Sequence, residues 1–273
     1  MKDIFNIKRF GKYLASDFRA SVSRFGLSFL LVSLMGLVIY AGTIIMGLML
    51  NGTWEGPSIY FRTATFAICI AVLVLTMPAK IYGHITEKRA GSTWLMIPAS
   101  IFEKFLSMIL ICGIIVPALF TCVYLGTDAL LCALDHTCGS SICHIGKDIA
   151  GYRSEIPEEV MSAVGGLMNP LSYIDDMIGS ILIFLLGAIC FKNAKVVKTI
   201  LFLIVLSMAL SIIGTPFMYS YMETLANNPA MTLEEFFSDS WLGNLSLIDT
   251  VNDIAVIVIA TAGIFFRLKT IKH

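Results

Sequence analysis

Charged residues are scarce in this chain, and their scarcity decides the class of protein. Asp, Glu, Lys and Arg make up 14% of the 273 residues, whereas a typical soluble domain carries about 25%. Hydrophobic residues account for 57%, and the mean hydropathy is +0.84. Such a composition excludes an ordinary soluble domain, because too little polar surface is left to face water. It indicates a chain that folds in a lipid bilayer.

The chain also lacks the short motifs that carry common chemistry. It contains no phosphate-binding loop of the form G-x-x-x-x-G-K-[ST], no H-E-x-x-H and no G-x-S-x-G. We therefore expect that the chain is not an enzyme. We also expect no cofactor, no resident metal and no nucleic-acid partner.

Long apolar runs stand in place of these motifs. A membrane-spanning helix needs about 20 mainly apolar residues. Six such spans can be drawn, over residues 27–50, 63–82, 101–127, 170–191, 199–219 and 247–266. The sequence therefore predicts an all-α, polytopic membrane protein with six transmembrane helices. Residues 1–273 would form a single transmembrane domain with the lipid bilayer as its solvent.

Basic residues sort to one side of this topology. With the N-terminus inside, 16 of the 19 Lys and Arg residues fall in inner segments, and only three fall outside, Arg62, Lys147 and Arg153. Lys and Arg concentrate in cytoplasmic loops. We therefore predict a protein of the cytoplasmic (inner) membrane with both termini cytoplasmic, and with two sizeable outer segments at residues 128–169 and 220–246.

The N-terminal segment, residues 1–24, predicts an amphipathic helix. Apolar residues recur there at helical spacing, and the basic residues fall largely off that stripe: Ile4, Ile7, Leu14 and Phe18 against Lys8, Arg9, Lys12 and Arg19. We expect this interfacial helix to lie flat on the cytoplasmic leaflet, with its basic face toward anionic headgroups. The alternative is a charged tail that only orients the first span.

The stretch ITEKRAGSTWLMIPASIFEKFLS, residues 85–107, interrupts the apolar sequence between the second and third spans. Gly91 suits the end of one helix, and Pro98 breaks a second, short one. Ser100 and Glu103 form a capping box, S-x-x-E, which predicts the start of the third span. We therefore expect an ordered cytoplasmic loop rather than a slack linker.

Two roles for this loop fit the sequence. An apolar group above a charged base could dock another protein, and its contact residues would be Glu87, Lys88, Arg89, Trp94, Leu95 and Met96. Alternatively, the loop folds back onto its own bundle, and Trp94 anchors at the membrane interface. The residues alone favour neither role.

The layout as a whole resembles the membrane subunit of ABC transporters of the ABC-2 type. That family has six spans with both ends inside, a flat helix before the first span and a structured turn between the second and third. It also has an outer helical segment between the fifth and sixth. The stretch EKRAGSTWLMIPASIFEKFLS is similar to a pattern in uncharacterised bacterial permeases: a glutamate and basic residues, then L-x-x-P-A-S, then E-K-F.

The resemblance implies partners that this chain does not contain. The loop would contact a separate cytoplasmic ABC ATPase, which binds ATP and Mg²⁺, and the six residues named above would form that contact. Two membrane subunits would work together, as a homodimer or as a heterodimer with a second permease. The chain departs from many members in its long, cysteine-bearing outer segment, which leaves the substrate open.

Four acids lie in the first turns of the fourth and sixth spans: Asp175, Asp176, Asp249 and Asp253. Acids inside a bilayer are costly and tend to be functional. Asp249 and Asp253 share a helix face, and the four are candidates for a translocation path or a cation site. The alternative is electrostatic, because both spans begin outside and acids are favourable at the N-terminal end of a helix.

Three cysteines, Cys132, Cys138 and Cys143, fall in the first outer segment. In an oxidising exterior two of the three could form one disulfide. The spacing does not choose the pair. His136 and His144 lie nearby, but the combined spacing fits no familiar zinc site.

These observations favour a permease subunit that moves an unidentified substrate with energy from a separate ATPase. Two alternatives of other classes stay open. A secondary transporter would use Asp249 or Asp253 to carry a proton or a cation. A non-transporting scaffold or sensor would read the outer segments and signal through the loop around Trp94.

Overall fold

The computed structural model describes residues 5–50, 52, 54, 56–87, 91, 92, 94, 96–139, 141, 142, 170–227 and 239–270. Within these residues every regular element is helical, which confirms the all-α fold class. In chain order the elements are α1 (Ile7–Ser33), α2 (Met35–Leu50), α3 (Ile59–Tyr82), η1 (Gly83–Thr86), α5 (Ile101–Ile109), η2 (Leu110–Ile115), α6 (Val116–Leu134), η3 (His136–Cys138), α9 (Pro170–Cys190), α10 (Lys195–Asn227) and α12 (Asp239–Thr270).

Four of the described helical stretches are long and apolar enough to cross a membrane: Ile7–Leu50, Ile59–Thr86, Ile101–Leu134 and Lys195–Ile212. A shorter apolar helix covers Asp176–Cys190. These helices agree with the membrane protein that the composition predicts. The count of six spans and the cytoplasmic location of both ends stay predictions. Residues 143–169 and 228–238 of the predicted outer segments lie outside the described residues.

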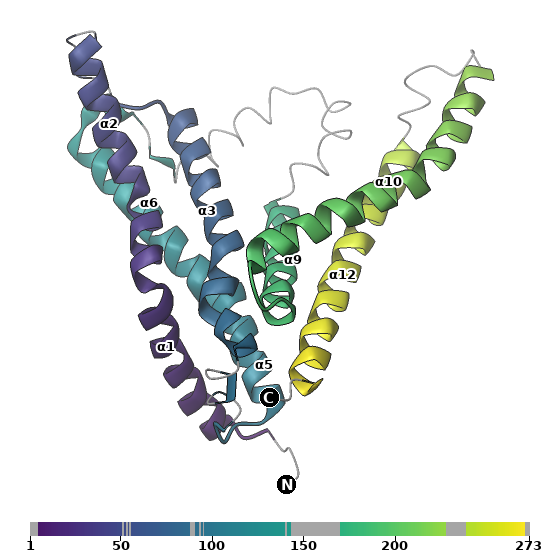
Figure 1. Cartoon of the computed structure of the whole chain (residues 1–273). Helices are drawn as coiled ribbons and strands as arrows, with labels where there is room; N and C mark the ends of the chain where they lie inside the picture. The colour runs from purple at the N-terminus through teal and green to yellow at the C-terminus, as the bar shows by residue number, and fades with distance from the viewer. Residues whose placement is uncertain are drawn as a thin grey trace.

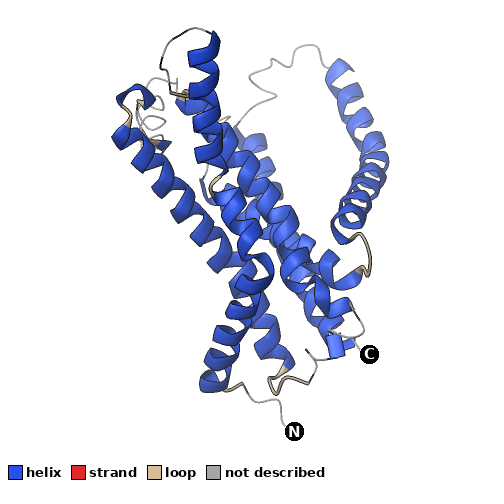
Figure 2. Ribbon diagram, turned by 60° about the vertical axis from the view of Figure 1, so that its left-hand side comes forward, coloured by secondary structure: helices blue, strands red, loops and turns tan. Residues whose placement is uncertain are grey.

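Most of the helices form a bundle, and α10 extends away from it (Figures 1 and 2). α1, α3, α5 and α6 pack together, α9 packs against α3 and α12, and α10 leads away from α9. We refer to the end of the bundle where both chain ends lie as the base, and to the opposite end as the top (Figure 1). The core runs along α3, where Leu73, Met77 and Ile81 are fully buried.

The prediction of a separate N-terminal helix over residues 1–24 is wrong in its boundary. α1 continues without a break through residue 24, and the backbone bonds Leu34 N–H to Leu30 O (3.0 Å) and Val38 N–H to Leu34 O (3.3 Å) carry the helix into α2. Its inward side chains are Tyr13, Asp17, Ser21 and Phe25, spaced four apart on one face. Because this stripe packs against the bundle, α1 is a core helix in its lower half.

The third predicted span begins where the sequence places it and runs further. Ser100 caps α5, and the helix continues from Ile101 to Leu134 through a π-helical turn, η2, at Leu110–Ile115. Pro117 lies two residues after this turn, in the first turn of α6. Proline lacks the N–H that an α-helix would use one turn back, and a local π turn is a common way to absorb such a disturbance.

Candidate functional site

Glu103 lies at the centre of the base and joins two distant segments. Its side chain has no exposed surface and completes the predicted capping box: Ser100 Oγ accepts from the Glu103 N–H (3.2 Å), and Glu103 Oε2 accepts from the Ser100 N–H (2.9 Å). The Arg9 guanidinium donates to both carboxylate oxygens at 2.8 Å, and the Asn6 N–H donates at 3.0 Å. One carboxylate therefore ties the start of α1 to the start of α5.

Trp94 points into the bundle. Its side chain is 6% exposed. Lys104 Nζ donates to the Trp94 carbonyl (2.9 Å) and lies 4.5 Å from the centre of the Trp94 ring. Lys104 is also buried, and a cation–π contact is strongest where water is excluded. Of the two roles that the sequence leaves open, the structure supports the one in which the loop folds onto its own bundle. The expectation that Trp94 is an exposed side chain is wrong.

The start of the loop is held by α10. Gly83 opens η1, and Lys195 Nζ, from the first residue of α10, donates to the Gly83 carbonyl. A Cβ at residue 83 would meet Lys195 Nζ at 2.9 Å, so any other residue there would require the Lys195 side chain to shift. Thr86 Oγ1 donates to the same carbonyl at 2.9 Å. The loop is therefore tied to the fifth predicted span as well as to the first and third.

The exposed part of the loop is its short apolar tip. Met96 is 83% exposed, and Glu87 is also exposed. Lys88, Arg89 and Leu95 lie outside the described residues. Of the six predicted contact residues, the structure therefore leaves Met96 and Glu87 on the surface, and their docking role stays a prediction.

A buried carboxylate that the sequence analysis missed lies deeper in the base. Asp17 Oδ2, on α1, accepts from the hydroxyls of Tyr82 (2.8 Å) and Ser107 (2.7 Å). Asp17 is 8% exposed, so the three side chains form a closed polar contact between α1, α3 and α5. The available signal was the stripe of residues 13, 17, 21 and 25, which puts an acid on the inward face of a helix.

A groove runs beside this cluster between α1 and the loop. Its α1 wall carries Lys8, Lys12 and Tyr13, and its loop wall carries Ile97 and Pro98. The Tyr13 hydroxyl is buried and makes no hydrogen bond within the described part of the chain. A basic wall facing an apolar one suits an acidic segment or an anionic headgroup.

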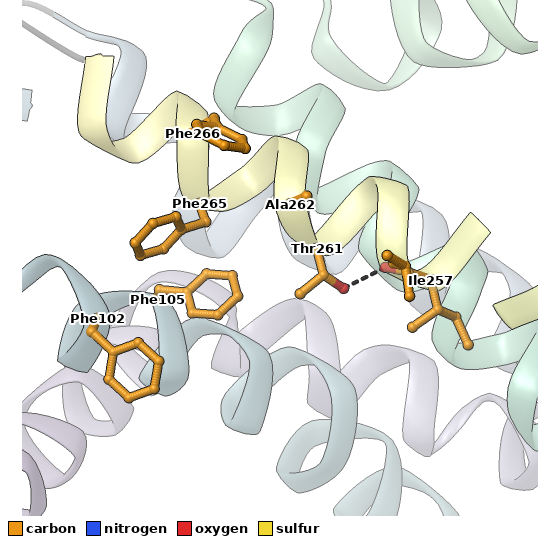
Figure 3. Close-up of a pocket in the computed structure, with 8 residues that line it drawn as sticks. Phe102, Phe105, Ile257, Thr261, Ala262, Phe265 and Phe266 are labelled. Carbon is orange, nitrogen blue, oxygen red and sulfur yellow. Dashed lines mark hydrogen bonds between the residues drawn. The ribbon is translucent and has the colours of Figure 1, made fainter. Parts of the chain in front are cut away.

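A second hollow, between α5 and α12, is entirely apolar in character (Figure 3). Phe102 and Phe105 line it from α5, and Ile257, Thr261 and Phe265 line it from α12. The Thr261 hydroxyl donates to the Ile257 carbonyl of its own helix, so it offers little to a ligand. The Phe105 and Phe265 rings meet edge to face at 5.6 Å. This hollow can hold an apolar group but offers no catalytic chemistry.

The four predicted path acids are only partly described. Asp176, on α9, is exposed. Asp175 lies on α9, and Asp249 and Asp253 lie on α12, but their side chains are outside the description. A role for these four in a translocation path stays a prediction.

A second charged cluster closes the top. Arg62 on α3 and Asp128 on α6 form an ion pair at 2.7 Å, and their side chains are only 6% and 7% exposed. The same guanidinium donates to Cys132 Sγ at 2.7 Å and to the Cys138 carbonyl at 2.9 Å. From the sequence, Arg62 is predicted only as a basic residue of the outer side. Its missed signal is an arginine within an apolar helix, which is rare unless it is paired.

Within the described part of the chain no group of three or more His, Cys, Asp or Glu side chains is close enough to hold a metal. Cys143, one of the three outer cysteines, lies outside that part. Comparison with protein-family models, with curated proteins and with solved structures finds no match to this chain. The resemblance to ABC-2 permeases therefore rests on the predicted topology and on the loop sequence.

Proposed function

We propose that this chain is the membrane subunit of a transporter powered by a separate ATPase, and that the base receives the motion of that ATPase. The observation that carries the proposal is the way in which the loop at residues 83–100 is tied to several helices at once. Glu103 links its end to α1, Lys104 holds Trp94 from α5, and Lys195 holds Gly83 from α10. A push on such a loop reaches three predicted spans together.

The exposed tip of the loop gives this proposal its contact surface. Met96 projects from the base while the adjacent Trp94 is buried. An exposed, flexible apolar side chain is a favourable anchor for a pocket on a partner. In this arrangement Met96 and Glu87 touch the ATPase, and Trp94 transmits the force without touching it.

The proposal is tested by purifying the tagged chain from its native membrane in mild detergent and identifying the proteins that accompany it. We expect a P-loop ATPase in a stoichiometric complex and an ATP hydrolysis rate that depends on the complex. Met96→Glu puts a charge on the contact surface and should reduce the amount of bound ATPase at least tenfold.

Met49→Glu is the matched control, because Met49 is also 83% exposed but lies at the top, next to the end of α2. It receives the same change at equal exposure and should keep the ATPase. Equal loss in both variants would indicate general damage to the fold. A wild-type chain that purifies without any ATPase, under conditions that preserve other membrane complexes, would overturn the proposal.

A second candidate function, a proton-coupled carrier, is favoured by Asp17. A carboxylate buried between three helices, with hydroxyl donors from Tyr82 and Ser107, has the surroundings of a proton-binding group in a membrane protein. Asp17 thereby joins Asp249 and Asp253 as a candidate for that role.

The proposed function as a proton-coupled carrier is tested in proteoliposomes that contain a pH-sensitive dye and across which a pH gradient is imposed. A carrier should collapse the gradient faster with wild-type protein than with Asp17→Asn. Ser107→Ala, which removes one donor and keeps the carboxylate, should retain most of the flux. Equal rates for wild type and Asp17→Asn would remove Asp17 from this role.

A further inference from the structure

Two cysteine sulfurs lie against each other at the top. Cys132 Sγ, in the last turn of α6, is 2.8 Å from Cys138 Sγ, at the end of η3. A disulfide bond is about 2.05 Å long, so the two sulfurs need to approach by less than about 1 Å to bond. The sequence alone leaves three pairings open among Cys132, Cys138 and Cys143.

The turn that brings the two cysteines together is held independently of them. Asp135 ends α6 and accepts from the Thr137 N–H (2.9 Å), from Trp54 Nε1 (3.1 Å) and from the Tyr40 hydroxyl. The chain then leaves Cys138 through Gly139 at φ +69°, a left-handed conformation that glycine adopts without strain. The geometry of the pair is therefore built in before any bond forms between the sulfurs.

The surroundings distinguish the two sulfurs. Cys132 is the more accessible, and its Sγ receives a hydrogen bond from the Arg62 guanidinium at 2.7 Å. Cys138 is buried, and burial raises the pKa of its thiol to about 12. Cys132 therefore has the character of the attacking sulfur and Cys138 that of the resolving one.

We infer that Cys132 and Cys138 form a disulfide that closes the top of the bundle. The reaction is a thiol–disulfide exchange with an external disulfide, either a small-molecule disulfide or the disulfide of a thiol oxidase. The Cys132 thiolate attacks one sulfur of the oxidant and releases the other as a thiolate. Cys138 then attacks Cys132 in the mixed disulfide, and the second thiolate leaves with the Cys138 proton. The two cysteines lose two electrons and two protons, and the oxidant gains them as two thiols.

The disulfide would fix the turn after α6, which covers the buried Arg62–Asp128 ion pair. The Cys138 carbonyl accepts from Arg62, and the Ile142 N–H donates to Asp128 Oδ2 at 2.8 Å, so the turn after α6 lies on both charged groups. Linking Cys138 to the end of α6 holds this turn in place. With the bond reduced, the turn keeps its hydrogen bonds to Asp135, Arg62 and Asp128 but loses this covalent link between Cys138 and the helix end.

The pairing is tested on the full chain in its native membrane. Free thiols are trapped in intact cells with N-ethylmaleimide, and the protein is digested without reduction by a protease that cleaves before Asp. Cleavage before Asp128, Asp135 and Asp148 separates the peptide 128–134, which holds Cys132, from the peptide 135–147, which holds Cys138 and Cys143. We expect the two peptides to be linked in most molecules, with N-ethylmaleimide on Cys143, and to separate on reduction.

Two variants define the alternatives. Cys143→Ser should leave the linked peptides in place, and Cys132→Ser should abolish them. Cys122→Ser, which changes an exposed cysteine on α6 outside the pair, is the control and should change nothing. N-ethylmaleimide on Cys132 in most wild-type molecules would overturn the inference. A bond inside the peptide 135–147, which would join Cys138 to Cys143, would overturn it as well.

Discussion

The two ends of the bundle are each held by a buried acid and an arginine, and they differ in how far solvent reaches the pair. At the top, Arg62 and Asp128 are 6% and 7% exposed. At the base, Glu103 is fully buried, but Arg9 is 44% exposed. Both pairs join helices that are distant in the sequence, α3 with α6 and α1 with α5.

This difference indicates different mechanical roles. The top pair has no access to water as an alternative partner, and the turn after α6 covers it. Separating its charges would leave each without its opposite charge in a medium of low dielectric, although Arg62 keeps the Cys138 carbonyl and Asp128 keeps the Ile142 N–H. The Arg9 side chain can exchange its contact for water at modest cost. We therefore expect the top to be the more fixed end of the bundle and the base to be the end that can rearrange more easily.

Breaking the Arg62–Asp128 ion pair at the top should have the largest effect on stability. Arg62→Ala leaves Asp128 buried without its partner, and such a loss costs about 3–5 kcal/mol. The measurement is SDS-induced unfolding of the purified protein in mixed micelles. The double variant Arg62→Met with Asp128→Leu removes both charges and should regain most of the stability. If the double variant is as unstable as Arg62→Ala, packing rather than charge holds the top.

Breaking the Arg9–Glu103 ion pair at the base should reduce the stability less than breaking the Arg62–Asp128 pair at the top. The comparison of these two losses is the sharpest test of the difference between the two ends. Arg9→Ala leaves Glu103 with hydrogen bonds from the Asn6 and Ser100 N–H groups. We expect a loss of about 1.5–3 kcal/mol, as for a hydrogen bond to a charged group, in the same unfolding assay. A loss equal to that of Arg62→Ala would contradict the distinction between a fixed top and an adaptable base.

A smaller effect is expected within the base at Asp17. Asp17→Asn keeps an oxygen that can accept from Tyr82 or Ser107 but replaces the other oxygen by an N–H₂ group. Removing charge from two hydroxyl hydrogen bonds should cost about 0.5–1.5 kcal/mol. Tyr82→Phe and Ser107→Ala remove one donor each, and coupling of either with Asp17→Asn in a double-mutant cycle measures the contact directly. Additive losses would mean that the hydroxyls do not act through Asp17.

Much of the fold follows from local sequence signals. The apolar runs predict the helices, and the S-x-x-E box predicts the start of α5 at Ile101, because both depend on residues within one or two turns. The extent of α1 does not follow, because Gly26 and the charged residues before it suggest a boundary. The continuous helix is favoured by packing of the stripe from Tyr13 to Phe25 against α3 and α5, which no local pattern contains.

The candidate sites depended more heavily on distant contacts. Glu103 is predicted as a helix cap, but its bond to Arg9 joins residues 94 positions apart. Trp94 has the same local sequence whether it is exposed or buried, and the buried ammonium of Lys104 decides between the two. The choice of Cys138 as the partner of Cys132 depends on the turn held by Asp135. These pairings come from tertiary packing, whereas the local sequence indicates only which residue types are present.

The smallest effect is expected from Asp135, a partly exposed acid at the top. Asp135 is hydrogen-bonded by Tyr40, Thr137 and Trp54, and these donors, with the Tyr40 hydroxyl foremost, hold the pKa of its carboxyl well below the usual value. A carboxyl whose pKa is lower in the folded state adds stability above its unfolded pKa of about 3.9. That stability is lost only as the pH falls through the folded pKa.

Acidification from pH 7 to about 5 should therefore leave the turn after α6 unchanged. Hydrogen exchange at the Thr137 N–H, which bonds Asp135, and at the Gly56 N–H, which bonds Thr137 Oγ1, measures this once intrinsic rates are corrected. Loss of protection near pH 6 would mean that another group holds the turn. Since Asp135 is less buried than Arg62 and Asp128, even Asp135→Asn should open the turn far less than Arg62→Ala. The rigidity of the top would then lie in the buried Arg62–Asp128 pair beneath the turn rather than in the hydrogen bonds to Asp135.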